Sequence, residues 1–118
     1  TMNRYRLLAD AKAKALDLAK DYKPPEPPTF NLPGPSGRVA LDMAVAGFHR
    51  QGKATDHDLV VLGELAEVLS GGDTDVIKTM TEAEVLELER TRFMNLVHHE
   101  GSLDRITHML ETGKPLRN

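Results

Sequence analysis

The stretch TDHDLVVLGELAEVLS, residues 55–70, is the most apolar helical segment of the chain and decides the expected fold. Its apolar residues surround most of a helix, which is the pattern of a helix buried among other helices. Thr55 stands three residues before Asp58, a pairing that resembles a capping box, and the glycines at 71 and 72 can end the helix. A narrow polar stripe remains at Asp58, Glu64 and Glu67.

An N-terminal helix is expected over residues 4–22, with Asn3 available as its N-cap. Apolar residues recur there at spacings of three and four, but several of them are alanine. Such a face is thin and permits close approach to another helix while burying little apolar area. The residues of this face are Leu8, Ala11, Ala15, Leu18 and Tyr22.

The helix before the central one should start after Ser36, run to about Gln51 and stop at Gly52. The short turn after Gln51 predicts that this helix and the central helix form an adjacent antiparallel pair. Gly47 inside the helix is unfavourable relative to alanine. We therefore expect a close helix contact at that position.

Two more helices are expected in the C-terminal third. Thr81 and Glu84 form a second capping box, which starts a helix that should continue to about His98. Gly101 is expected to break it. Ser102 can then cap a last helix, which ends at Gly113. The predicted fold is therefore all-α, with about five helices.

A proline-rich segment, KPPEPPTFNLPGPSG at residues 23–37, separates the first helix from the others. Proline removes amide donors and keeps the preceding residue extended, so no helix is expected here. We interpret the chain as an N-terminal helix (1–23), an extended connector (24–36) and a four-helix module (37–118). Phe30 and Leu32 suggest a connector that lies along the protein surface. A proline-rich ligand for another domain is the alternative.

Composition narrows the function classes. The chain has no cysteine, which excludes thiol nucleophiles, thiolate metal sites and disulfides. No apolar run is long enough to span a membrane and no signal peptide is evident, so a cytoplasmic protein is expected. Residues 53–90 hold ten acidic and three basic side chains, whereas residues 1–23 hold six basic and three acidic ones. The acidic middle disfavours nucleic acid, including a helix-turn-helix arrangement over residues 38–69.

Neither a metal site nor a catalytic site is predicted. His98 and His99 are consecutive, and a turn separates them from His108, so the spacing does not suit zinc. His57 lies in the first turn of the central helix, where it is interpreted as part of the capping region with its acidic neighbours. The serines stand at expected helix ends, and no carboxylate pair suits acid–base catalysis. Thr1 is an unusual first residue, so a fragment of a longer protein is expected.

The last third of the chain reads ELERTRFMNLVHHEGSLDRITHMLETGKPLRN from Glu87. It resembles the C-terminal end of the crotonase family, in which a glutamate and a phenylalanine four residues later match Glu89 and Phe93. The closing part of the family pattern matches Glu111, Lys114 and Pro115. MLETGKPLRN, together with LLADAKAKALDLA near the start, looks like the tail of bacterial fused 3-hydroxyacyl-CoA dehydrogenase/enoyl-CoA hydratase proteins of fatty-acid β-oxidation.

The resemblance implies a structural and oligomerisation segment whose parent enzyme uses NAD and a coenzyme A thioester. Its partners would be the rest of the parent and further copies, and it would hold no cofactor of its own. Met109 and Thr112 replace the phenylalanine and lysine that usually face coenzyme A, and Lys114 keeps a charge suited to a phosphate. Met109 and Lys114 are therefore the candidate edge of a coenzyme A site. A free-standing helical interaction module is the alternative.

Overall fold

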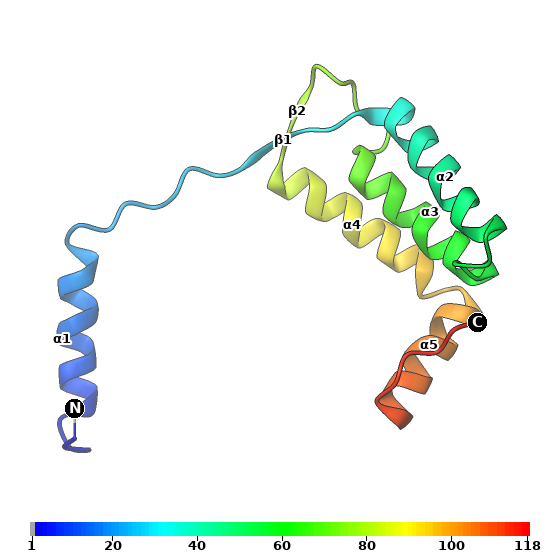
Figure 1. Cartoon of the computed structure of the whole chain (residues 1–118). Helices are drawn as coiled ribbons and strands as arrows, with labels where there is room; N and C mark the ends of the chain where they lie inside the picture. The colour runs from blue at the N-terminus through cyan, green and yellow to red at the C-terminus, as the bar shows by residue number, and fades with distance from the viewer. Residues whose placement is uncertain (1) are drawn as a thin grey trace.

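The computed structural model describes residues 2–118, which form five helices and one small two-stranded sheet (Figure 1). This confirms the all-α class, although the two strands were not predicted. The elements in chain order are α1 (Leu7–Ala19), β1 (Thr29–Asn31), α2 (Gly34–Arg50), α3 (Asp56–Ser70), β2 (Thr79–Thr81), α4 (Glu82–Leu96) and α5 (Glu100–Thr112).

The central helix α3 packs between α2 on one side and α4 on the other (Figure 1). It is less enclosed than its composition predicts, because Leu65 and Leu69 remain 45% and 53% exposed. The buried apolar core among the described residues is correspondingly small and consists of Ala66 and Met80. The three-helix layer thus leaves apolar surface on α3 and α4.

Both predicted capping boxes are present. The Thr55 hydroxyl accepts a hydrogen bond from the Asp58 amide, and the Asp58 carboxylate accepts one from the Thr55 amide. Thr81 and Glu84 repeat this arrangement at the start of α4. Gly71 has φ 83°, the left-handed conformation that glycine adopts most easily, and it ends α3 as expected.

The predictions that Ser36 and Ser102 cap helices are wrong, because the hydroxyl of each serine has a different partner. α2 begins at Gly34, and the Ser36 hydroxyl donates to the Pro33 carbonyl at 3.1 Å. α5 begins at Glu100, so that Ser102 lies inside the helix. At the first helix, the Asn3 side chain accepts from the Tyr5 amide at 3.0 Å, but α1 begins only at Leu7.

Two glycines also differ from expectation. α4 ends at Leu96, so Gly101 does not break it and instead lies within the first turn of α5. The position that a Cβ of Gly47 would occupy has nothing within 4 Å among the described residues. The expected close helix contact at Gly47 is therefore absent from the described chain.

The proline-rich connector is anchored by the small sheet. β1 pairs antiparallel with β2, so that Thr29 stands opposite Thr81 and Phe30 opposite Met80. The side chain of Leu32 lies against Gly71, whose added Cβ would be 2.9 Å from the Leu32 Cβ. Phe30 and Leu32 therefore lie along the packed helices as predicted, whereas residues 23–28 of the connector extend away from them (Figure 1). Strands of only three residues have too little periodicity to be recognised in a sequence.

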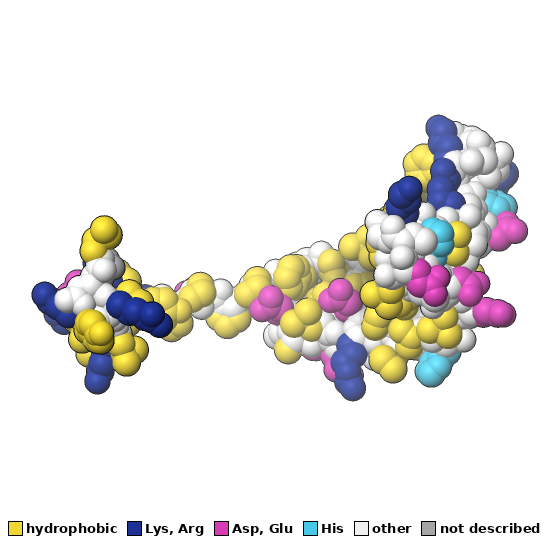
Figure 2. Space-filling view, turned by 90° about the horizontal axis from the view of Figure 1, so that it is seen from below, with side chains coloured by type: hydrophobic (Ala, Val, Ile, Leu, Met, Phe, Trp, Pro, Cys, Tyr) yellow, Lys and Arg dark blue, Asp and Glu magenta, His cyan; other side chains and the backbone are white. Residues whose placement is uncertain are grey.

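α1 stands apart from the other helices at the end of the extended connector (Figure 1). No residue of α1 is buried. Figure 2 shows this helix end-on, with apolar and basic side chains on its surface. None of the described helices is both long enough and apolar enough to cross a lipid bilayer.

Candidate functional site

An ion cluster around one buried carboxylate joins the three packed helices. Glu67 of α3 is 5% exposed, and its carboxylate accepts hydrogen bonds from two arginines. Arg92 of α4 donates through Nη2 at 2.8 Å, and Arg38 of α2 donates through Nη1 to the other oxygen. Arg92 also lies 3.7 Å from Glu64. The polar stripe of α3 is therefore the side through which it is clamped to its neighbours, since charge-assisted bonds of this kind are strong and directional.

A second joint connects α5 to the start of α3. Arg105 donates to the Thr55 hydroxyl at 3.2 Å and its Nη2 lies 2.8 Å from the Asp58 carboxylate. The Thr55 amide, together with Arg105, lowers the pKa of Asp58 to about 2. Hydrogen bonds to the charged form of a carboxyl group have this effect. Asp58 is thus ionised at neutral pH and holds two helices together.

His57 contacts α5 in addition to occupying the first turn of α3. Its Nε2 shares a hydrogen bond of 2.9 Å with the hydroxyl of Ser102, which is 8% exposed. The other ring nitrogen faces Gly101, where an added Cβ would lie only 2.8 Å from Nδ1. A serine–histidine pair acts in catalysis when a carboxylate orients that second nitrogen. Here Gly101 lies against that side of the ring, and the pair packs α5 onto α3.

Metal-binding side chains do not converge within residues 2–118: no three of His, Asp and Glu lie close enough to hold an ion. The histidines do not gather in one cluster, although two of their rings lie near each other. His49 Nε2 lies 2.8 Å from the Asp56 carboxylate on the next helix. The rings of His57 and His99 are 6.5 Å apart between centroids.

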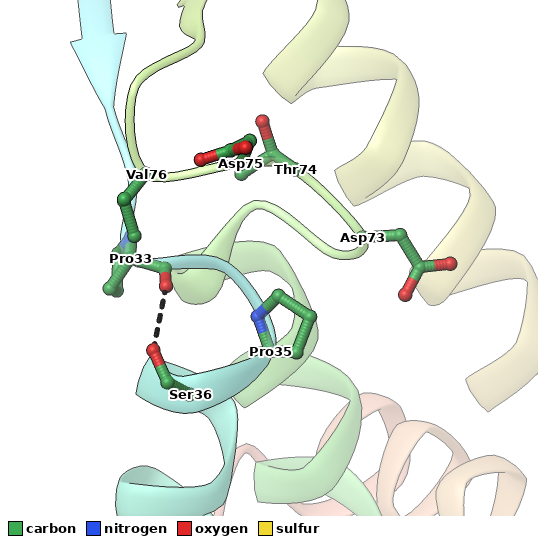
Figure 3. Close-up of a pocket in the computed structure, with 7 residues that line it drawn as sticks. All are labelled: Pro33, Pro35, Ser36, Asp73, Thr74, Asp75 and Val76. Atoms are coloured by element: carbon green, nitrogen blue, oxygen red, sulfur yellow. Dashed lines mark hydrogen bonds between the residues drawn. The ribbon is translucent and has the colours of Figure 1, made fainter.

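An open pocket of about 410 Å³ lies beside the start of α2 (Figure 3). The Ser36 hydroxyl at its base is already bonded to the Pro33 carbonyl. Thr74 has a buried hydroxyl without a hydrogen-bond partner among the described residues, and Asp75 accepts from the Ile77 amide. These groups do not form a catalytic set. The lining residues are Pro33, Pro35, Ser36, Asp73, Thr74, Asp75 and Val76.

A more apolar groove of about 210 Å³ lies between α3 and α4, and we call it the α3–α4 groove. Arg92 and Glu64 contribute its polar rim together with Glu89, which is exposed. Phe93 is 56% exposed here and also lines a neighbouring hollow with Leu86. A concave apolar surface with few charges is typical of a binding site. The apolar lining consists of Val61, Leu65, Val68, Phe93 and Leu96.

The candidate coenzyme A edge lies on and after α5, and neither of its residues lines the pocket or groove described above. Met109 is 45% exposed, and its carbonyl accepts from the Gly113 amide. Lys114 is exposed, and its amide donates to the Thr112 hydroxyl at 3.2 Å. An apolar side chain and a free ammonium group are suited to the edge of a phosphate-bearing ligand.

The described residues thus define an all-α segment built around an ion-paired centre. Over its full length the chain is similar to a segment of a Bacillus subtilis (strain 168) protein described as "Probable 3-hydroxyacyl-CoA dehydrogenase", with 34% identity over 119 aligned residues. The alignment spans 100% of this chain but 15% of that relative. No protein-family model matches the chain, and no solved structure gives a significant match.

Proposed function

We propose that the chain is the C-terminal helical segment of a fused 3-hydroxyacyl-CoA dehydrogenase/enoyl-CoA hydratase of fatty-acid β-oxidation. The observation that carries the proposal is the alignment of the whole chain, at 34% identity, with 15% of a much longer dehydrogenase. The crotonase-like pattern of Glu89, Phe93 and the closing residues supports the hydratase part. The segment has structural and oligomerisation duties and no complete active site of its own.

The longer protein would oxidise a 3-hydroxyacyl-CoA thioester with NAD, in the cytoplasm, without nucleic acid or membrane as partner. The partners of this segment are the rest of that enzyme and further copies of it. The ion-paired centre suits this role, because the pairs formed by Glu67 and Asp58 fix the positions of four helices relative to one another.

Met109 and Lys114 are proposed to border the coenzyme A site of the longer enzyme. Lys114→Ala in that enzyme should raise the KM for the thioester several-fold and leave kcat unchanged, because the ammonium group would contact a phosphate remote from the reacting carbons. Lys20→Ala, a change of the same type next to α1, is the control. An unchanged KM for Lys114→Ala would remove this residue from the site.

The main experiment compares the 118-residue chain with the full reading frame that contains it. NAD reduction by a 3-hydroxyacyl-CoA and hydration of a short enoyl-CoA are measured for both. Both reactions are expected only for the longer protein. Turnover by the 118 residues alone, or a reading frame without a dehydrogenase upstream, would contradict the proposal.

A free-standing helical interaction module is the second candidate, and the exposed α3–α4 groove favours it. The two candidates differ in what lies upstream of Thr1. A reading frame that begins close to Thr1 supports the module, whereas one that extends for several hundred codons supports the enzyme segment.

A further inference from the structure

α1 presents an apolar face that no other described element buries. At 3.6 residues per turn, Leu8, Ala11, Ala15 and Leu18 fall on one side of the helix, while Leu16 lies on the other. Leu8 and Leu18 are 83% and 64% exposed, and Tyr22, which follows the end of α1, is 68% exposed. A helix of 13 residues is marginal in water by itself, and most of the stability of such helices comes from packing. α1 therefore requires a surface to cover this face.

Basic side chains border the apolar face of α1. On the helical wheel Lys12 and Lys14 flank it, one on each side. The acidic residues Asp10 and Asp17 of α1 lie farther round, towards the opposite side. The face is thus apolar at its centre and positive at both edges. Its best partner is an apolar groove with a negative rim.

The α3–α4 groove is complementary through its floor and through Glu89 on its rim, where Arg92 is already paired with Glu64 and Glu67. Its floor is apolar, and the apolar surface continues past Phe93 to Leu86. On the rim, Glu89 is exposed and forms no ion pair within residues 2–118. Glu82 adds exposed negative charge along α4, and Glu87 is exposed there in an ion pair with Arg90. A helix with small residues in its contact face can approach such a groove closely.

The connector determines which copy of the groove α1 can reach. Every residue from Lys23 to Pro28 is either a proline or precedes one, so all six are held extended. Such a run spans roughly 19 Å at about 3.1 Å per residue. A reversal at Tyr22 would return α1, about 20 Å long at 1.5 Å per residue, only to the neighbourhood of the sheet. With the connector running away from the packed helices, as in Figure 1, it would not lie beside Phe93 and Leu96 in the last turns of its own α4.

We infer that α1 docks in the α3–α4 groove of a second copy of this chain, with Lys12 and Lys14 beside glutamates of the partner's α4. In a symmetric pair each copy supplies one helix and one groove, which gives a closed dimer. The inference rests on the oligomerisation role in the proposed function and identifies its surface. It is independent of any catalytic activity of the longer protein.

Cysteine cross-linking tests this arrangement cleanly, because the chain has no native cysteine. Ala15→Cys places a thiol on the docking face of α1, and Leu65→Cys places one in the groove. The two variant chains are mixed and treated with a short bifunctional thiol reagent. Ala13→Cys is the matched control, since it changes the same residue type on the opposite side of α1. We expect the Ala15→Cys and Leu65→Cys pair to cross-link at least five-fold more than the control pair.

Equal cross-linking of the two pairs would overturn the inference, as would sedimentation of a strict monomer at high concentration. A link that forms within the Ala15→Cys/Leu65→Cys double variant, but not between separate chains, would place α1 on its own groove and also overturn it. Lys12→Glu with Lys14→Glu should weaken association, and Glu87→Lys with Glu89→Lys should restore it. A failed dehydrogenase assay would refute the proposed activity without changing any of these readouts.

Discussion

Glu67 of α3 and Arg92 of α4 are joined by a hydrogen bond of 2.8 Å between Oε1 and Nη2, at a carboxylate that is 5% exposed. Arg38 of α2 binds the other carboxylate oxygen. Buried charges are stable only when they are paired and hydrogen-bonded. The Glu67 carboxylate is therefore the shared counter-charge of two arginines in the three-helix layer.

Glu67→Gln should destabilise the chain substantially, because it leaves two guanidinium groups without their shared counter-charge. Breaking a fully buried pair costs about 3–5 kcal/mol. Arg38 and Arg92 are 42% and 29% exposed, so solvent screens part of the loss. We expect a decrease of about 2 kcal/mol in the free energy of unfolding, measured with urea.

The control for this change is Glu87→Gln, which removes a carboxylate from the exposed pair with Arg90. It should alter the free energy of unfolding by less than about 0.5 kcal/mol. If both variants unfold at the same urea concentration, the cluster around Glu67 does not stabilise the fold.

Gly101→Ala should destabilise the contact between α3 and α5. A glycine inside a helix normally gains stability when it becomes alanine, by up to about 1 kcal/mol. At Gly101 the new Cβ would instead stand 2.8 Å from the His57 ring, which its bond to Ser102 holds in place. We expect a loss of about 1–2 kcal/mol from overpacking, measured by thermal or urea unfolding.

Gly63→Ala in α3 is the matched change, because nothing lies within 4 Å of its Cβ position in the described chain. It should leave stability unchanged or raise it. Opposite signs for the two substitutions are the expected result; a stabilising Gly101→Ala would show that α5 does not pack on His57.

Asp58 should make the free energy of unfolding depend on pH in the acidic range. The pKa of Asp58 is lowered to about 2 in the folded chain, from an ordinary value of 3.8. A carboxyl group with a depressed folded pKa contributes stability above its unfolded pKa, and this contribution is lost as the pH falls through the folded value. Unfolding followed from pH 5 to pH 2 should therefore show a decline in stability that is shallower in Asp58→Asn. Parallel curves for the two proteins would contradict this assignment.

Chymotrypsin should distinguish the two ends of the connector. Tyr22 is exposed beyond the end of α1, whereas Phe30 lies in β1 and is paired with Met80. Proteases need an extended, unpaired backbone, so cleavage after Tyr22 should precede cleavage after Phe30 at low protein concentration. Mass spectrometry of the early fragments gives the order. In urea both sites should be cut at similar rates, which controls for intrinsic preference.

The sequence predicts those parts of the fold in which the interacting residues lie close together in the chain. Thr55 and Thr81 were predictable as caps because their partners lie three residues away. Ser102 was misassigned because its partner, His57, is 45 residues distant. Glu67 was likewise read only as part of a stripe, since its arginines lie 29 and 25 residues away. Local patterns carry no information on such partners.

The residues of the candidate site likewise divide into those that the sequence predicted and those that it did not. Glu89 and Phe93 were singled out through the family resemblance, and both line the α3–α4 groove. The groove itself was not predicted, because it depends on how far α3 and α4 leave each other's apolar faces exposed. Met109 and Lys114 stay predictions, since their role concerns a ligand of the longer enzyme.

The small sheet links α1 and the proline-rich connector to the start of α4 through one residue. Thr81 is both the last residue of β2 and the N-cap of α4, and it stands opposite Thr29, the first residue of β1. The proline run that precedes Thr29 has no hinge. A force applied to α1 is therefore transmitted along a stiff lever to the first turn of α4. Tension on α1 would act on the first turn of α4 before any other part of the four-helix module unfolds.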